Sequence, residues 1–385
     1  MKILSINNFF AQNSNQLQSK QYNTPFFGIK AKPTLEADTV SFKEAKFSRK
    51  KIAQAVTTLS KDVVDIKTKT VKQASKTNNQ EVVKLPDATV RSILALYHKP
   101  FEHFKTHLYT TFSTLEAEGK VTLGAIPKKS FSIREKAQSL GITNKEEVLK
   151  YIADISRGRI IVNSEDSFES VIKTFSKLLK KGNFKVIDFE NHRLPSKYLG
   201  NGNFSSNDAF DITQINRLKQ IATNSNYELQ TKDIDSHVGY SGIHITLQDE
   251  NGFKHELQII TKGMFKVKEP EDLLYKIKAG KMLEPKYQTR LYPKLKILRP
   301  VEEIEVIGSD KKVIKQAVFK DTLDKPEPEV LTDEMKEIRK RVFKYTKDAY
   351  KYALEHPYTD NVLPAPEGLE KFDFARIFNE MLQCK

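Results

Sequence analysis

A histidine and an acid fall on one face of a predicted β-hairpin. The segments 243–247 and 256–260 alternate between polar and apolar residues and are separated by an Asp-Glu-Asn-Gly turn. Because side chains alternate between the two faces of a strand, His244, Glu256 and Gln258 are predicted to share a face. Imidazole and carboxylate groups so placed can move protons or hold a cation. The alternative interpretation is a polar face that only contacts water.

A second acid and further polar residues precede that hairpin. Asp154 lies just before the predicted strand 159–162, where its carboxylate could share a divalent cation with Glu256. Two carboxylates give the hard oxygen ligation that suits magnesium with a bound triphosphate. Ser132 and Lys136 are one helical turn apart and could face a phosphate together. Taken singly, each of these residues is better explained as an ordinary surface side chain.

The hydrophobic pattern predicts the elements that must position these residues. Apolar residues recur at helical spacing from Asp87 to Leu108, with a kink expected at Pro100, and Thr143 with Glu146 forms a capping box. We expect an α+β fold, in which a small mixed or antiparallel sheet is flanked by helices and has a helical N-terminal cover. The predicted helices are 87–108, 143–151, a helix between Ser164 and Gly182, and 212–222; the predicted strands are 159–162, 184–189, 243–247 and 256–260.

The chain divides into three predicted regions. Residues 1–85 form a basic arm that is mostly disordered or loosely helical, because its apolar content is too low to offset the entropy of ordering. Residues 86–285 form the main domain, with a core at 120–280 and an inserted loop at 190–235 that is rich in Asn, Ser and Gly. Residues 286–385 form a C-terminal extension.

The C-terminal extension is predicted to contain a strand pair and a basic helix. The strands are expected at 301–307 and 313–319, followed by the Pro-rich linker 325–328. A helix that starts near Thr332 carries apolar residues on one side and many lysines and arginines on the other. We expect this helix to pack against its own domain, and binding to RNA is the alternative.

Composition narrows the possible partners. The chain has 385 residues, a formal net charge of +15 and 38% hydrophobic residues, so anionic partners such as nucleotides, RNA or membrane surfaces are favoured. A single cysteine, Cys384, excludes an intrachain disulfide framework and a Cys-based zinc site. The first ten residues are too polar for a signal-peptide core. We expect a soluble, cytoplasmic protein that does not bind membranes.

Four sequence blocks, in order, resemble the synthetase domain of RelA/SpoT-type pyrophosphokinases. The blocks are KKSFSIREK (128–136), ADISRGRIIV (153–162), GYSGIHITL (239–247) and HELQIITKGM (255–264). The resemblance implies a nucleotidyltransferase-like fold of the RelA/SpoT synthetase type. It also implies a magnesium-dependent enzyme that transfers pyrophosphate from ATP to the 3′-hydroxyl of GDP or GTP, in guanosine tetraphosphate metabolism and the stringent response.

The resemblance implies a role for each matching residue on the donor side. Lys128 and Lys136 would contact the phosphates of ATP, with Ser132 beside them. Arg159 would support the same site, and Asp154 would ligate Mg²⁺. Pyrophosphoryl transfer needs mainly in-line positioning and cations that offset charge at the phosphates, which agrees with this set of residues.

On the acceptor side the resemblance implies an aromatic, a histidine and a second acid. Tyr240 would stack on the acceptor base, and His244 would meet a phosphate. Glu256 would ligate the metal or take the proton from the 3′-hydroxyl, with Gln258 beside it. A carboxylate near the attacking hydroxyl completes the chemistry that the family requires.

Three positions depart from the family pattern. Ile126 stands two residues before Lys128, where the family has an arginine, and Ile260 replaces a second arginine in the strand after Glu256. The segment 235–238 reads Asp-Ser-His-Val in place of the usual Pro-Lys-x-Asn. Two alternatives to the alarmone synthetase therefore stay open. One is an enzyme that pyrophosphorylates the 3′ end of tRNA; the other is a catalytically silent nucleotide-binding or interaction module. The oligomeric state is not determined by the sequence.

Overall fold

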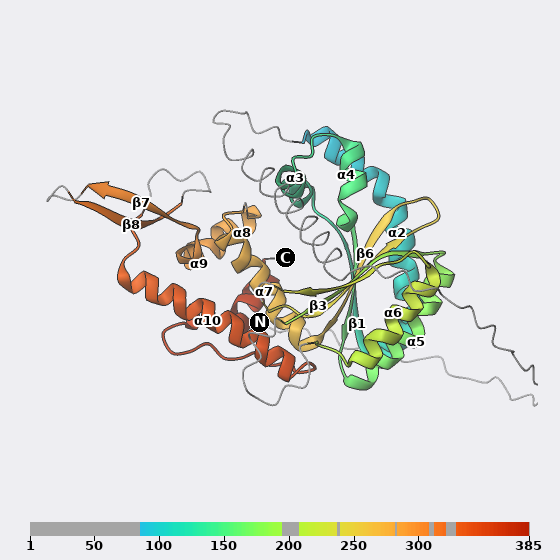
Figure 1. Ribbon diagram of the computed structural model, residues 1–385. Coiled ribbons are helices and arrows are strands. Elements are labelled where there is room, and N and C mark those ends of the chain that lie inside the picture. The colour runs from blue at the N-terminus through green and yellow to red at the C-terminus, as the bar shows by residue number, and fades with distance from the viewer. Residues whose placement is uncertain are drawn as a thin grey trace, which may run out of the picture. The chain divides into compact units, whose positions relative to one another are not determined.

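The computed structural model describes residues 85–194, 208–236, 239–281, 283–307, 312–320 and 329–384 (Figure 1). The predicted arm 1–85 therefore lies, except for Leu85, outside the described residues. The linker 325–328 and the middle of the predicted insertion lie outside them as well.

A six-stranded mixed sheet forms the centre of the described chain, with the strand order β1-β2-β6-β5-β3-β4. The pairs β2/β6 and β3/β4 are parallel, and the other neighbours are antiparallel. The predicted α+β class with a small mixed sheet flanked by helices is confirmed. The strands are β1 (Val121–Pro127), β2 (Ser156–Val162), β3 (Lys185–Arg193), β4 (Thr231–Asp235), β5 (Gly242–Gln248) and β6 (Lys254–Thr261).

Helices cover both faces of this sheet (Figure 1). One face packs against α2 (Asp87–Ala117), α5 (Glu165–Lys181) and α6 (Ile212–Ser225). The other face meets α7 (Lys262–Lys278), and α10 (Asp333–Glu355) and α11 (Phe374–Gln383) pack against α7. The shorter helices are α3 (Ser130–Ser139), α4 (Lys145–Tyr151), α8 (Pro285–Arg290) and α9 (Tyr292–Leu295), with single 3₁₀ turns at Ala153–Ile155, Lys296–Leu298 and Glu370–Phe372.

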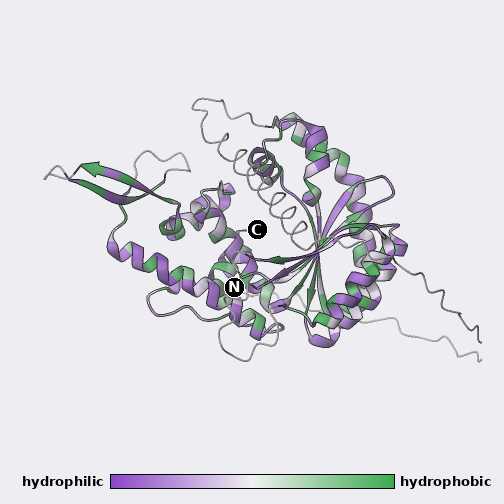
Figure 2. Cartoon of the chain, viewed as in Figure 1, coloured by the Kyte–Doolittle hydropathy of each residue, from purple (hydrophilic) through white to green (hydrophobic). Residues whose placement is uncertain are grey.

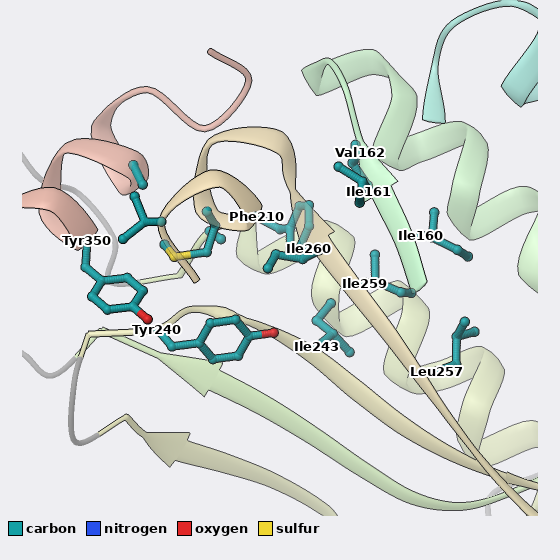
Figure 3. Packing of buried hydrophobic residues seen from close by; sticks show 14 of the residues in the cluster. Ile160, Ile161, Val162, Phe210, Tyr240, Ile243, Leu257, Ile259, Ile260 and Tyr350 are labelled. Carbon is teal, nitrogen blue, oxygen red and sulfur yellow. The ribbon is translucent and has the colours of Figure 1, made fainter. Parts of the chain in front are cut away.

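One apolar core joins the sheet to the helices on both sides. Fully buried members of this core lie side by side on the neighbouring strands β2, β6 and β5, among them Ile160, Ile243, Leu257 and Ile259 (Figure 3). The same core continues past residue 285 into α10 and α11. Hydrophobic and hydrophilic stripes along α5 and α10 show how each helix buries one side (Figure 2).

A close approach between β2 and α2 depends on a glycine. A β-carbon placed on Gly158 would come within 2.6 Å of Phe104 Cζ and 2.9 Å of Leu108 Cδ2. A side chain at this position would therefore push the long helix away from the sheet.

Several local predictions need correction. Asn144, and not Thr143, caps α4, because the Asn144 side chain accepts a hydrogen bond of 2.9 Å from the backbone N–H of Glu147. Helix α2 runs through Pro100 as one element of 31 residues and ends at Ala117, beyond the predicted end at Leu108. The predicted insertion 190–235 begins inside β3 and ends in β4, so its two ends belong to the sheet.

The C-terminal strands form a sheet of their own. The predicted pair is present as β7 (Val301–Ile307) and β8 (Val313–Phe319), paired antiparallel. The predicted helix near Thr332 is α10, and the Thr332 side chain caps it by accepting from the N–H of Met335. Among the described residues, no helix is long and apolar enough to cross a lipid bilayer.

Candidate functional site

The face of the sheet that meets α7 carries a continuous row of polar side chains. The register places His244 opposite Gln258, and Glu256 opposite both Thr246 and Arg157. Arg159 lies opposite Gln258 on the other side of β6. The alternation on which the hairpin prediction rested therefore brings His244, Glu256 and Gln258 to one face. We call this surface the polar face.

Asp154 lies between two lysines, just before β2. Its two carboxylate oxygens accept hydrogen bonds from Lys128 Nζ at 2.5 Å and from Lys136 Nζ at 2.8 Å. Lys128 follows β1 directly and is only 8% exposed, whereas Lys136 reaches in from α3. Ser132 lies on the same helix, one turn before Lys136. Lys128, Lys136 and Asp154, three of the residues expected at the donor end, are thus in direct contact.

The electrostatics of this group are dominated by the two lysines. Burial raises the pKa of Asp154, but the ammonium groups of Lys128 and Lys136 outweigh it and hold that pKa at about 2. Burial also lowers the pKa of Lys128, with Asp154 opposing this shift. The ion pair therefore outweighs burial in setting the pKa of Asp154 but not that of Lys128. Asp154 has two cations beside it, while Lys128 has one acid and the further cations Lys136 and Arg157. We conclude that Asp154 is a carboxylate at neutral pH.

Arg159 is positioned by helix α7. Its guanidinium contacts Glu269 Oε1 at 2.9 Å and lies over the ring of Phe265, 5.0 Å from the centroid. Lys268 lies 3.6 Å from the same Glu269 carboxylate. Glu269 and Lys268 are absent from the sequence-based site, although α7 brings both of them to the edge of the polar face. The sequence signal that could have placed them was the helical spacing of Met264, Val267 and Leu274, which indicates the helix that carries both residues.

Tyr240 and His244 are hydrogen-bonded to each other. The Tyr240 hydroxyl lies 2.9 Å from His244 Nε2, and the Tyr240 side chain is only 8% exposed. Tyr240 lies beside Tyr350 of α10 (Figure 3). Burial, together with His192, Lys268 and Arg159, holds the pKa of His244 well below its ordinary value, so its imidazole is neutral at neutral pH. Stacking of a base on Tyr240 requires part of this ring to be uncovered.

Glu256 and Gln258 interact along β6. Gln258 Nε2 donates a short hydrogen bond to Glu256 Oε1. Gln258 Oε1 is buried and has no hydrogen-bond partner among the residues that the structure describes. The acid and the amide therefore support each other, and one buried acceptor atom faces the site without a donor.

Two residues of β3 join the polar face, and sequence analysis did not select them. Glu190 lies directly opposite His244, and His192 follows two positions later on the same face. His192 Nε2 is 3.2 Å from Glu190 Oε2. The available signal was the alternation Glu-Asn-His at 190–192, which we had assigned to the inserted loop.

Ile126 and Ile260, which stand where the family has arginines, have different surroundings. Ile126 is 58% exposed and lies opposite Arg157 on β2. Ile260 is fully buried in the main core. A cation could be accommodated at residue 126, whereas at residue 260 it would be buried among apolar side chains.

Comparisons with known proteins give matches in structure only. A scan against protein-family models and a search of curated proteins find no match. The small alarmone synthetase 1 from Bacillus subtilis bound to its product pppGpp is 21% identical over 49% of this chain and 82% of that one, with a TM-score of 0.30. The same enzyme bound to AMPCPP is 18% identical over 54% and 88% of the two chains, with a TM-score of 0.28.

A further solved structure is similar over a longer part of the chain. A GTP pyrophosphokinase family protein from Streptococcus pneumoniae is 18% identical over 67% of this chain and 96% of that one, with a TM-score of 0.32. These identities and TM-scores are too low to support the assignment of individual site residues, which is therefore based on the side chains of this chain alone. The chain resembles a RelA/SpoT-type synthetase domain in four ordered sequence blocks, and it is similar over part of its length to solved alarmone synthetases.

Proposed function

We propose that this protein is a magnesium-dependent pyrophosphokinase that transfers the β,γ-pyrophosphate of ATP to the 3′-hydroxyl of GDP or GTP. The observation that carries the proposal is the grouping of Lys128, Lys136 and Asp154 at one end of the sheet face that also carries Glu256. Asp154 lies just before β2, and Arg157 of β2 lies opposite Glu256, which connects this group to the polar face. These nucleotides are cytoplasmic metabolites, and we place the reaction there.

The donor end would hold the triphosphate by charge. Lys128 and Lys136 supply ammonium groups, and Arg159 supplies a guanidinium whose position Glu269 fixes. Arg157 lies opposite Ile126 and provides a cation next to the position where the family has an arginine. Such groups stabilise charge that develops on phosphate oxygens during transfer.

The two carboxylates fit magnesium by their chemistry. Asp154 and Glu256 would hold the ion, because hard oxygen ligands are what Mg²⁺ prefers. Both oxygens of Asp154 accept hydrogen bonds from lysines. For Asp154 to bind the metal, Lys128 and Lys136 must give up these bonds and instead donate to the phosphates of ATP. The bound ion would offset charge on the transferred group. Nucleotide and metal are therefore expected to bind together.

The acceptor end would activate the 3′-hydroxyl. Glu256 is the carboxylate available to accept its proton, and Gln258 orients Glu256 through their hydrogen bond. Tyr240 and His244 lie along the same face, where the acceptor nucleotide would bind. Their mutual hydrogen bond keeps both rings in place.

The proposal is tested by incubating the full chain with γ-labelled ATP, Mg²⁺ and GDP, GTP or deacylated tRNA, and resolving the products. Label in a guanosine tetra- or pentaphosphate is expected, because the γ-phosphate moves with the pyrophosphate. Lys136→Gln should weaken ATP binding, whereas Lys150→Gln on the exposed side of α4 is the matched control. Nucleotide binding without transfer to any acceptor would contradict the proposal and favour the silent module.

A tRNA acceptor is the second candidate, favoured by a basic groove along α10. The groove is lined by apolar residues of β7, β8 and α10 and by the cationic residues Lys336, Arg339, Lys340, Lys344 and Lys347. A row of this kind suits a polyanionic backbone. Label in tRNA but not in guanosine nucleotides, with a steep decrease as salt rises, would select this candidate.

A further inference from the structure

Three side chains able to ligate a metal lie together at the β3/β5 pair, apart from the two carboxylates proposed for magnesium. Glu190 and His192 occupy alternate positions of β3, so both project from the polar face, and the register places His244 directly opposite Glu190. One ligand atom from each of the three lies within 4.8 Å of the others. Among the described residues, this is the only group of three or more such side chains that meets this condition.

The spacing of the first two ligand atoms already suits a shared ion. His192 Nε2 and Glu190 Oε2 are 3.2 Å apart. Two ligands that each lie about 2.1 Å from one metal ion are separated by roughly 3.0–3.4 Å at tetrahedral or octahedral angles. The rings of His192 and His244 have centroids 4.4 Å apart, so a small rotation brings the third donor to the same point.

Tyr240 supplies the outer support that a ligating histidine needs. Its hydroxyl oxygen lies 2.9 Å from His244 Nε2, where it can accept the N–H of that nitrogen. In that tautomer the lone pair of Nδ1 is available to a metal. Ligating histidines commonly donate their other N–H to such a partner, which fixes the ring and its tautomer.

We propose that Glu190, His192 and His244 form a binding site for one divalent transition-metal ion of the Zn²⁺ type. Two imidazoles and one carboxylate are a ligand set for zinc, iron or cobalt, whereas magnesium prefers oxygen ligands alone. The nearby cations are engaged by acids: Arg159 and Lys268 contact Glu269, and Lys232 contacts Asp188. The site is therefore not filled by a neighbouring ammonium or guanidinium group.

The position of the site suggests its use, which, unlike the binding itself, rests on the proposed function. His244 lies two residues of β5 from Thr246, the residue opposite Glu256. A metal ion held there would bind a phosphate of the acceptor nucleotide and orient its 3′-hydroxyl toward Glu256. The ion would add positive charge at the acceptor end to that of Arg159 and Lys268.

Cobalt is the probe, because Co²⁺ bound by histidines absorbs visible light. The chelator-treated full chain is titrated with Co²⁺, and we expect one ion per chain, displaced by Zn²⁺ and not by Mg²⁺. His192→Asn and Glu190→Gln should each weaken binding by more than the roughly 10–100-fold that loss of an outer partner costs. Tyr240→Phe should fall within that smaller range. His103→Asn is the matched control, since His103 and His107 form an exposed ring pair on α2.

The outcomes separate this site from the proposed reaction. Glu256→Gln should bind Co²⁺ like the wild-type protein while losing transferase activity. Circular dichroism shows whether each variant is folded. Absence of visible absorption at saturating Co²⁺, or equal binding by folded His192→Asn, would reduce Glu190 and His192 to an ordinary ion pair and overturn the proposal. Metal binding without any pyrophosphate transfer would refute the proposed function alone.

Discussion

Two histidines on adjacent strands, His244 and His255, lie on opposite faces of one sheet and have different surroundings. His255 of β6 is fully buried on the core face, and its ring stacks on Phe104 with centroids 4.8 Å apart. Its Nδ1 lies 2.7 Å from Ser156 Oγ, and its Nε2 lies 3.5 Å from Asp249 Oδ2. Both histidines have a lowered pKa, and burial is the first cause for each.

The difference lies in the kind of groups around each ring, since Nε2 of His255 also has no hydrogen-bond partner within the described chain. His255 has one hydroxyl, one acid and two aromatic rings around it, a closed arrangement that leaves little for a ligand to contact. His244 lies among cations and other ligand-type groups, beside Gln258, whose Oε1 has no partner within the described chain. A lowered histidine pKa therefore does not identify a functional site by itself; the partners of the ring distinguish a packed residue from a binding residue.

Removal of the proposed base on the polar face should have the largest effect. Glu256→Gln keeps the hydrogen-bonding shape of β6 but cannot accept a proton, so transfer should fall by about 10²–10⁴-fold. The unfolding free energy should stay close to that of the wild-type protein, because Glu256 is not part of the core. Initial rates with labelled ATP and urea unfolding measure the two quantities. Unchanged turnover would remove Glu256 from the mechanism.

On the core face a substitution should reduce the unfolding free energy and leave the transfer activity nearly unchanged. His255→Ala removes the Ser156 contact, the stacked ring and the contact with Asp249 Oδ2, so the unfolding free energy should fall by about 3 kcal/mol. Turnover per folded molecule should change little. Chemical denaturation combined with an active-fraction assay tests this. A variant with wild-type stability would show that the core face does not depend on His255.

Acid should destabilise the protein in two pH ranges, first through the histidines of both faces and then, at lower pH, through Asp154. Burial lowers the pKa of His255 from 6.5 to about 4, so its contribution is complete above pH 6.5 and is lost as pH falls toward 4. The lysines hold the pKa of Asp154 at about 2 against an ordinary 3.8, so its contribution is present above pH 3.8 and is lost as pH falls toward 2. The Asp154 step should amount to about 2 kcal/mol.

Unfolding free energies measured from pH 8 to pH 2 would resolve these two steps. The first step should be smaller in His255→Ala, where His244 still contributes to it, and the second should be missing in Asp154→Asn. A single step that both variants share would mean that the two faces unfold as one titrating unit.

The smallest effect is expected from restoring a cation at residue 126. Ile126 is exposed, so Ile126→Arg should cost little stability and should lower the KM for ATP by about tenfold, by adding a charge-assisted contact of about 1.5 kcal/mol to the phosphates. Ile260→Arg is the contrasting variant, because it would bury a charge in the core. An unchanged KM for ATP in Ile126→Arg would show that Arg157 already supplies that charge.

The sequence allowed the fold class and half of the polar face to be predicted. Strict alternation at 243–247 and 256–260 placed His244, Glu256 and Gln258 together, because a period of two depends only on local geometry. The pairing of β2 with β6 could not be predicted from periodicity, since this parallel pair joins segments that are far apart in the chain.

The remaining parts were missed for local reasons. Strand β1 contains Gly124 and ends at Pro127, which weakens its strand pattern. Helix α7 carries Pro270 within a charged stretch, so Glu269 and Lys268 were not linked to the site. The end of β3 is polar on every residue from Glu190 to Arg193, which resembles a loop more than a strand.

The contacts of α7 with the C-terminal helices have a practical consequence for preparing the protein. The backbone N–H of Gly263 donates to Pro357 O at 2.8 Å, and Lys262 bonds Asp360 at 2.6 Å. A truncated chain that stops near residue 285 would expose apolar surface of α7 to water, including Phe265, whose ring packs against Phe378 of α11. Such a fragment should aggregate on expression even though it contains all four sequence blocks, and loss of activity in it would report exposed hydrophobic surface and not the role of a missing residue.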